Sequence, residues 1–242
     1  MTVPLCAVVL AYRGGAPLAT ALDALAWAGE RAILDPAGVV RTADVPVGVH
    51  LERRADDLST LGTLPWLLLL AEHEEALPEL PAAADAAMAA GPAALRPRLE
   101  LDTLGVRFVL PAAPVRLAPR VECRLSVDRS CVPELAAPHP SRSLDAAIRV
   151  HRGDTVADAF DLLQGEGALL SLLLAQLGKP GRRGLPASPL AALSRVLRAR
   201  ADRRAGLARW VAAVFAGYRV VLAQARCWEW QHAQPALVRE VG

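Results

Sequence analysis

The sequence predicts an α/β fold in which a mostly parallel sheet is flanked by helices and followed by a C-terminal helical extension. Two short, largely apolar runs, Pro4–Ala11 and Arg31–Leu34, are separated by a glycine turn and a helical pattern. Apolar runs of this length are typical of parallel strands with both faces covered, and parallel strands need a crossover of this kind. From Thr155 onward the pattern becomes mainly helical, which predicts the extension.

The first half of the chain alternates strands and helices. The expected elements are a strand at Pro4–Ala11, a helix at Pro17–Ala28, strands at Arg31–Leu34 and Val47–Leu51, a helix at Asp56–Leu64 and a strand at Trp66–Leu70. This order favours a parallel sheet with helices on both faces. Ligands bind such sheets beyond the carboxyl ends of the strands, which here are the loops Tyr12–Gly15, Asp35–Gly38 and Ala71–Glu75.

The second half changes from strands to helices. The expected elements are a helix at Leu80–Ala90, short strands within Leu99–Asp145, a helix at Val156–Leu177, a loop at Gly178–Ser188, and one or two helices over Ser188–Gln231 with a break near Asp202–Gly206. Ser188 is expected to cap its helix, with Pro189 in the first position. We expect residues 1–152 to form the sheet domain, with a strand-rich extension at 99–152, and residues 153–242 to pack on it.

Composition excludes several classes of protein. The 242 residues are 53% hydrophobic, enough for a sizeable core, and the net charge of +2 gives no bulk electrostatic case for nucleic acid binding. The four cysteines have no C-x-x-C spacing, so no zinc or redox motif is indicated, and a reducing cytoplasm fits. Because the longest uncharged apolar runs are shorter than the ~18–20 residues that cross a bilayer, we expect no membrane-spanning helix. Met1–Ala11 is expected to be a strand rather than a signal peptide.

Several segments together resemble family-two glycosyltransferases, in particular the small bacterial branch related to lipopolysaccharide core glycosyltransferases. That branch has a Trp-Ala pair before its second strand, an Asp-bearing turn after it, and a fourth strand of the form W-x-L-x-L-D-x-D-E followed by Pro-Glu-Leu. The matching segments here are Trp27-Ala28, Ile33–Gly38, Trp66–Glu74 and Pro78–Leu80, with weaker matches at Val115–Leu117, Val132–Glu134, Ile148–His151 and Tyr218–Glu229. The resemblance covers most of the chain.

The resemblance implies a GT-A (Rossmann-like) fold and an activity. The implied reaction is inverting sugar transfer from a nucleotide-sugar to a hydroxyl of a cell-surface glycan or lipid-linked acceptor, at the inner face of the membrane. It implies that the nucleotide-sugar contacts Tyr12, Arg13, Gly14, Asp35 and Glu72. It also implies that Glu134 removes the acceptor proton as a general base. From the residues alone, Asp35 also fits an ordinary turn, and Glu134 an exposed loop position.

The metal-binding motif departs from the family. Its D-x-D pair holds a divalent cation, manganese or magnesium, against the diphosphate. Here Ala71 and His73 stand at the two aspartate positions, so His73 and Glu74 are the candidate ligands. The alternative for this acidic stretch is a solvated first turn of a helix. Pro133 also replaces the histidine of the family's V-H-E segment.

Two hypotheses follow. One is an active glycosyltransferase; the other is a catalytically dead scaffold or binding protein that acts through its C-terminal helices. An enzyme should keep an open cleft at the strand ends, whereas a scaffold is expected to have it filled by its own side chains. The arginine-rich stretch Ser188–Arg209 is expected either to contact an anionic membrane peripherally or to lie solvated on the surface. The tryptophans of the last helix could meet the core, a protein partner or a membrane interface.

Overall fold

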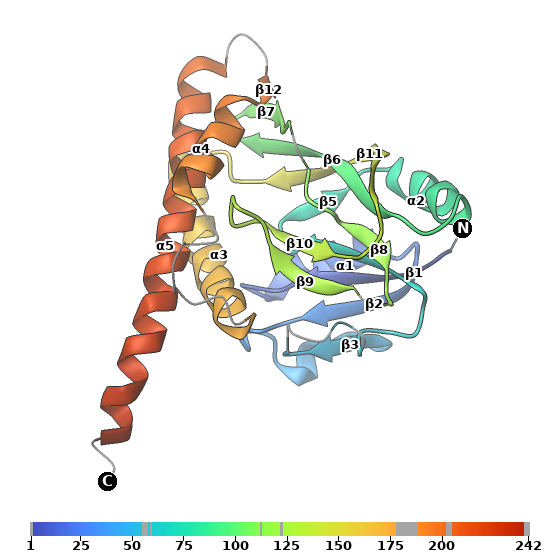
Figure 1. Cartoon of the computed structure of the whole chain (residues 1–242), viewed down its shortest axis with the longest axis horizontal. Helices are drawn as coiled ribbons and strands as arrows, with labels where there is room; N and C mark the ends of the chain where they lie inside the picture. The colour runs from blue at the N-terminus through green and yellow to red at the C-terminus, as the bar shows by residue number, and fades with distance from the viewer. Residues whose placement is uncertain are drawn as a thin grey trace.

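The computed structural model describes residues 2–54, 58, 60–111, 113–121, 123–177, 188–201 and 205–239, the last nine by their backbone only. Its centre is a large mixed sheet, and three C-terminal helices stand against one end of it (Figure 1). The α/β class and the flanked, Rossmann-like sheet are therefore confirmed.

The parallel half of the sheet matches the predicted strands. β1 (Val3–Leu10) lies between β2 (Ala28–Leu34) and β4 (Trp66–Ala71), with β3 (Val49–Glu52) outside β2, and all these pairings are parallel. Every residue of β4 is buried, as an apolar run covered on both faces requires. The crossover from β1 to β2 is α1 (Gly15–Ala24), which is shorter than the expected helix.

The other half of the sheet is mixed. β8 (Leu117–Pro119) pairs antiparallel with β4 and with β6 (Ala94–Thr103), and β11 (Ser141–His151) runs parallel to β6. The remaining strands are β5 (Glu74–Ala76) on β11, β7 (Val106–Val109) on β6, β12 (Arg200–Ala201) on β7, and a separate pair, β9 (Arg124–Val127) with β10 (Pro133–Ala136). The predicted strand-rich region is therefore present.

The alternating side chains of β1 enter two apolar clusters. Val3, Leu5 and Val9 pack with α1 and with α2 (Leu80–Ala89). Cys6 and Val8 pack on the opposite face with the β9–β10 pair and α3 (Val156–Gln176). The cluster with α1 and α2 also includes residues of the last two helices, so the helical extension shares a core with the sheet.

The C-terminal helices begin where their caps predict. Thr155 caps α3 through a capping box with Asp158, and the Ser188 hydroxyl accepts a hydrogen bond from Ala191 N–H at the start of α4 (Pro189–Leu197). The chain leaves the helical path at β12 and resumes in α5 (Gly206–Arg239), close to the predicted break. α5 lies alongside both α3 and α4, and its last turns extend past the rest of the fold (Figure 1).

Two local expectations are wrong. Leu58 and residues 60–65 are not helical; Gly62 has φ of 78° and Pro65 follows, a sequence that favours turns. Residues 55–57 and 59 lie outside the described chain, as does most of the loop predicted at Gly178–Ser188. The acidic stretch is not a helix start either, because Glu74–Ala76 forms β5 and pairs with β11.

The search for uncharged apolar runs found none long enough to cross a membrane, but one helix of the described chain is long and apolar enough by length and composition alone. Within Gly206–Trp230, which is part of α5, an 18-residue stretch has a mean hydropathy of 1.3, and 33% of that stretch is buried. Scattered charged residues interrupt this stretch, so a search for uncharged runs misses it.

Candidate functional site

The loop that follows β1 is closed by a carboxylate of the same chain. The backbone N–H groups of Tyr12, Arg13 and Gly14 donate to the Glu72 carboxylate at 3.1, 3.0 and 3.1 Å. Gly14 adopts φ of 71°, which suits glycine and lets its N–H turn toward the same point as its neighbours. Glu72 itself is only 5% exposed.

Successive backbone N–H groups that converge in this way form an anion-binding concavity. This is the kind of site that holds a nucleotide's phosphates at the carboxyl end of a strand. Here Glu72 supplies the anion. Burial raises the pKa of Glu72, and the three N–H donors and His73 only partly offset that rise. Four of the residues predicted to contact the nucleotide-sugar therefore lie together, but the first three bind the fourth: Tyr12, Arg13, Gly14 and Glu72.

Asp35 likewise satisfies its own turn. Its side chain is fully buried and accepts hydrogen bonds from Val39 N–H at 3.0 Å and Val40 N–H at 2.9 Å. Arg53 approaches the same carboxylate at 3.6 Å. The turn-forming alternative describes this geometry, since neither carboxylate oxygen is left facing solvent.

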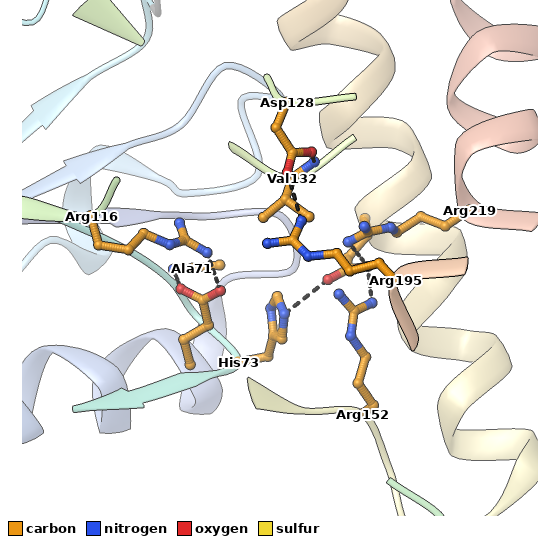
Figure 2. A network of polar contacts seen from close by, with 10 residues as sticks. Ala71, His73, Arg116, Asp128, Val132, Arg152, Arg195 and Arg219 are labelled. Carbon is orange, nitrogen blue, oxygen red and sulfur yellow. Dashed lines mark hydrogen bonds and ion pairs between the residues drawn. The ribbon is translucent and has the colours of Figure 1, made fainter. Parts of the chain in front are cut away.

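The two candidate metal ligands point to different partners (Figure 2). Glu74 accepts from the buried Arg116 guanidinium through one oxygen and from Ala71 N–H at 3.0 Å through the other. His73 Nε2 lies 2.9 Å from the Glu166 carboxylate, and the ring of Tyr12 meets the His73 ring edge-on, with centroids 5.4 Å apart.

The polar centre around His73 contains a residue that the sequence did not single out. Glu166, in the middle of α3, is 4% exposed, and its carboxylate contacts Arg152, His73 and Arg219. Burial alone would raise the pKa of Glu166, but Arg152, His73 and Arg219 reverse the direction and hold it well below its ordinary value. The only signal in the sequence is an acidic residue on the apolar stripe of a helix, between Gly165 and Gly167.

These side chains do not fit a divalent cation. Among the described residues, no group of three His, Cys, Asp or Glu side chains is placed to hold a metal. Arg152 and Arg219 contact Glu166, and Arg116 pairs with Glu74, so each carboxylate already has an arginine beside it that repels a further cation. We therefore derive no chemical step through a metal.

The predicted base lies in another place. Glu134, on β10, lines a surface cleft of about 420 Å³, whereas Tyr12 and His73 line a cavity of about 30 Å³ that Glu134 does not enter. The cleft is rich in arginine, with Arg96, Arg129, Arg195 and Arg198 among its lining residues. Burial, followed by the nearby Asp128 carboxylate, raises the pKa of Glu134. The structure thus separates Glu134 from the β1 loop.

Comparison of the chain with protein-family models finds no match, and comparison with curated proteins finds no similar protein either.

Proposed function

We propose that this chain is a non-catalytic binding protein on a glycosyltransferase-like fold, which acts at a membrane surface through α5. The observation that carries the proposal is the closure of the β1 loop by Glu72. A nucleotide diphosphate would have to displace three charge-assisted hydrogen bonds, and its phosphates would then face the freed carboxylate. A strand-end site filled by the chain's own side chains favours the scaffold hypothesis over the enzyme.

The exposed side of α5 supports a binding role. Between Gly206 and Trp228, every exposed residue is glycine, alanine or a larger apolar or aromatic residue. The large ones are Leu207, Trp210, Val214, Tyr218, Val221 and Trp228, and Trp230 follows just beyond. Trp and Tyr are enriched where an apolar phase meets water, so this stripe suits the interface of a bilayer.

The same helix is built to lie on a membrane rather than to cross it. Its opposite side carries Arg219, which is buried against Glu166 of α3, and Val220, which is part of the core. If α5 crossed the bilayer, this side of the helix would lose its contacts with α3 and the core. The exposed Arg198 and Arg200 lie just before α5 and can meet lipid phosphates, each contributing about 1 kcal/mol near an anionic surface.

Vesicle flotation tests the membrane contact. The full chain is expected to float with phosphatidylglycerol-containing vesicles, and Trp210→Ser with Trp228→Ser is expected to abolish flotation. Val47→Ser, at a fully exposed apolar residue before β3, is the matched control and should float normally. Failure of the wild type to float refutes the membrane surface. A dimer that the tryptophan changes dissociate, without flotation, would assign the stripe to a second copy instead.

A second candidate function is the inverting sugar transfer that the sequence resemblance implies. The observation that favours it is the open arginine-lined cleft at Glu134, where the raised pKa suits a general base. Glu134→Gln would then abolish turnover and leave donor binding intact. No stabilisation of the wild type by any nucleotide-sugar, with or without manganese, would exclude this candidate and agree with the proposed function.

A further inference from the structure

A cavity of about 70 Å³ lies between the mixed half of the sheet and the three C-terminal helices. Most of its wall is apolar. The apolar lining includes Leu99, Leu101, Leu163, Val196, Phe215 and Ala216. Four charged side chains also line the wall, beside Ser130: Glu74, Arg152, Arg195 and Arg219. The volume is well above the ~10–15 Å³ that one water needs, so a small organic molecule fits.

The charged wall has more positive than negative groups. One carboxylate, Glu166, is shared between Arg152, Arg219 and His73. The two other carboxylates of the network each have an arginine of their own: Asp128 pairs with Arg195, and Glu74 pairs with Arg116 (Figure 2). Arginine stays protonated in proteins, so the network holds one positive charge in excess even when His73 is neutral.

Arg219 has the longer of the two arginine contacts with Glu166, at 3.6 Å, so we place the excess charge there. Its side chain is 7% exposed, and although it donates to the Ser130 carbonyl at 2.9 Å, its buried Nε has no hydrogen-bond partner. Burial first, and then the neighbouring Arg152, lower the pKa of Arg219. A buried guanidinium with an unused donor and a like charge beside it is strongly unfavourable unless an anion compensates it.

We infer that this cavity binds a small organic anion, with an oxyanion head on Arg152 and Arg219 and a short apolar body against the leucines and Phe215. Planar guanidinium groups match carboxylate and phosphate oxygens through paired hydrogen bonds. The apolar wall favours a ligand with a hydrocarbon part over a bare inorganic ion. The inference uses neither Glu72 nor Glu134, and neither residue lines this cavity.

Thermal denaturation of the full chain tests the inference with sodium butanoate, its neutral analogue butanamide, and inorganic phosphate, all at constant ionic strength. Butanoate at about 100 times its Kd is expected to raise Tm saturably by about 5–10 °C. Butanamide should have no effect. Equal shifts with butanoate and butanamide, or no saturable shift with either anion, would overturn the inference. A Tm shift with phosphate alone would refute the inference that the ligand has an apolar body.

Three variants test whether the Tm shift caused by butanoate arises from this cavity. Arg219→Met removes the excess charge at similar volume and should eliminate the butanoate shift, whereas Arg107→Met, at a half-exposed arginine on β7, should keep it. If Arg219→Met does not fold, Ala216→Leu fills the cavity from α5 without changing charge and should also eliminate the shift. A butanoate shift that persists in Ala216→Leu would place the anion elsewhere and refute the site.

Discussion

Replacing Glu72 by Gln tests whether the β1 loop depends on its internal anion. One Glu72 oxygen accepts from both Tyr12 and Gly14, and the other accepts from Arg13. Glutamine retains one acceptor oxygen, and its NH₂ group must then face a backbone donor. The change therefore removes at least one hydrogen bond to a charged acceptor, about 1.5–3 kcal/mol, and leaves a poorly solvated N–H unpaired, about 1–3 kcal/mol.

Allowing for partial relaxation, we expect Glu72→Gln to lower the free energy of unfolding by about 2–4 kcal/mol and Tm by about 5–15 °C. Urea and thermal denaturation followed by circular dichroism measure both quantities. Glu79→Gln, at an exposed residue before α2, is the control and should change stability by less than about 0.5 kcal/mol. If Glu72→Gln is as stable as Glu79→Gln, the carboxylate does not hold the loop, and the argument for a closed site fails.

Three further predictions concern stability and reactivity. The folded protein lowers the pKa of Glu166, so the ionised carboxylate stabilises the fold above the ordinary Glu pKa of about 4.3, and this stabilisation is lost as pH falls below that value. From pH 6 to pH 3, the free energy of unfolding should therefore decline more steeply in the wild type than in Glu166→Gln. Parallel declines would contradict this. Gly62→Ala should destabilise the fold by more than 1 kcal/mol in urea denaturation, because φ is 78° and a Cβ would lie 2.9 Å from the Cys6 sulfur; wild-type stability would show that the turn relaxes. Burial raises the pKa of Cys6 to about 12 and that of Cys131 to about 11, so these thiols should react with a thiol reagent at pH 8 only on unfolding, and fast labelling of the native protein would refute their burial.

The residues that the sequence resemblance aligns with a D-x-D motif make contacts inside the protein. Glu72, between Ala71 and His73, accepts hydrogen bonds from the β1 loop. His73 contacts the Glu166 carboxylate on α3. This edge of the sheet therefore connects the sheet to the C-terminal helices.

The sequence by itself determined the local structure well. Short apolar runs predicted β1, β2 and β4, and residues that cap helices stand at the starts of α3 and α4, at Thr155 and Ser188. These signals act between residues a few positions apart, so a periodic pattern or a capping residue contains them. The prediction of a helix at Asp56–Leu64 is wrong for the described residues of that range, because Gly62 and the nearby proline favour a turn.

Only the tertiary structure decided what the polar residues do. Asp35, Glu72 and His73 were found as candidates because they follow strands, but a strand end does not reveal which partner a carboxylate meets. Glu72 bonds to N–H groups 58 to 60 positions away, and His73 meets Glu166 from a helix much later in the chain. A buried charge takes whichever partner the packing of distant elements brings within about 3 Å, and no local pattern records that choice.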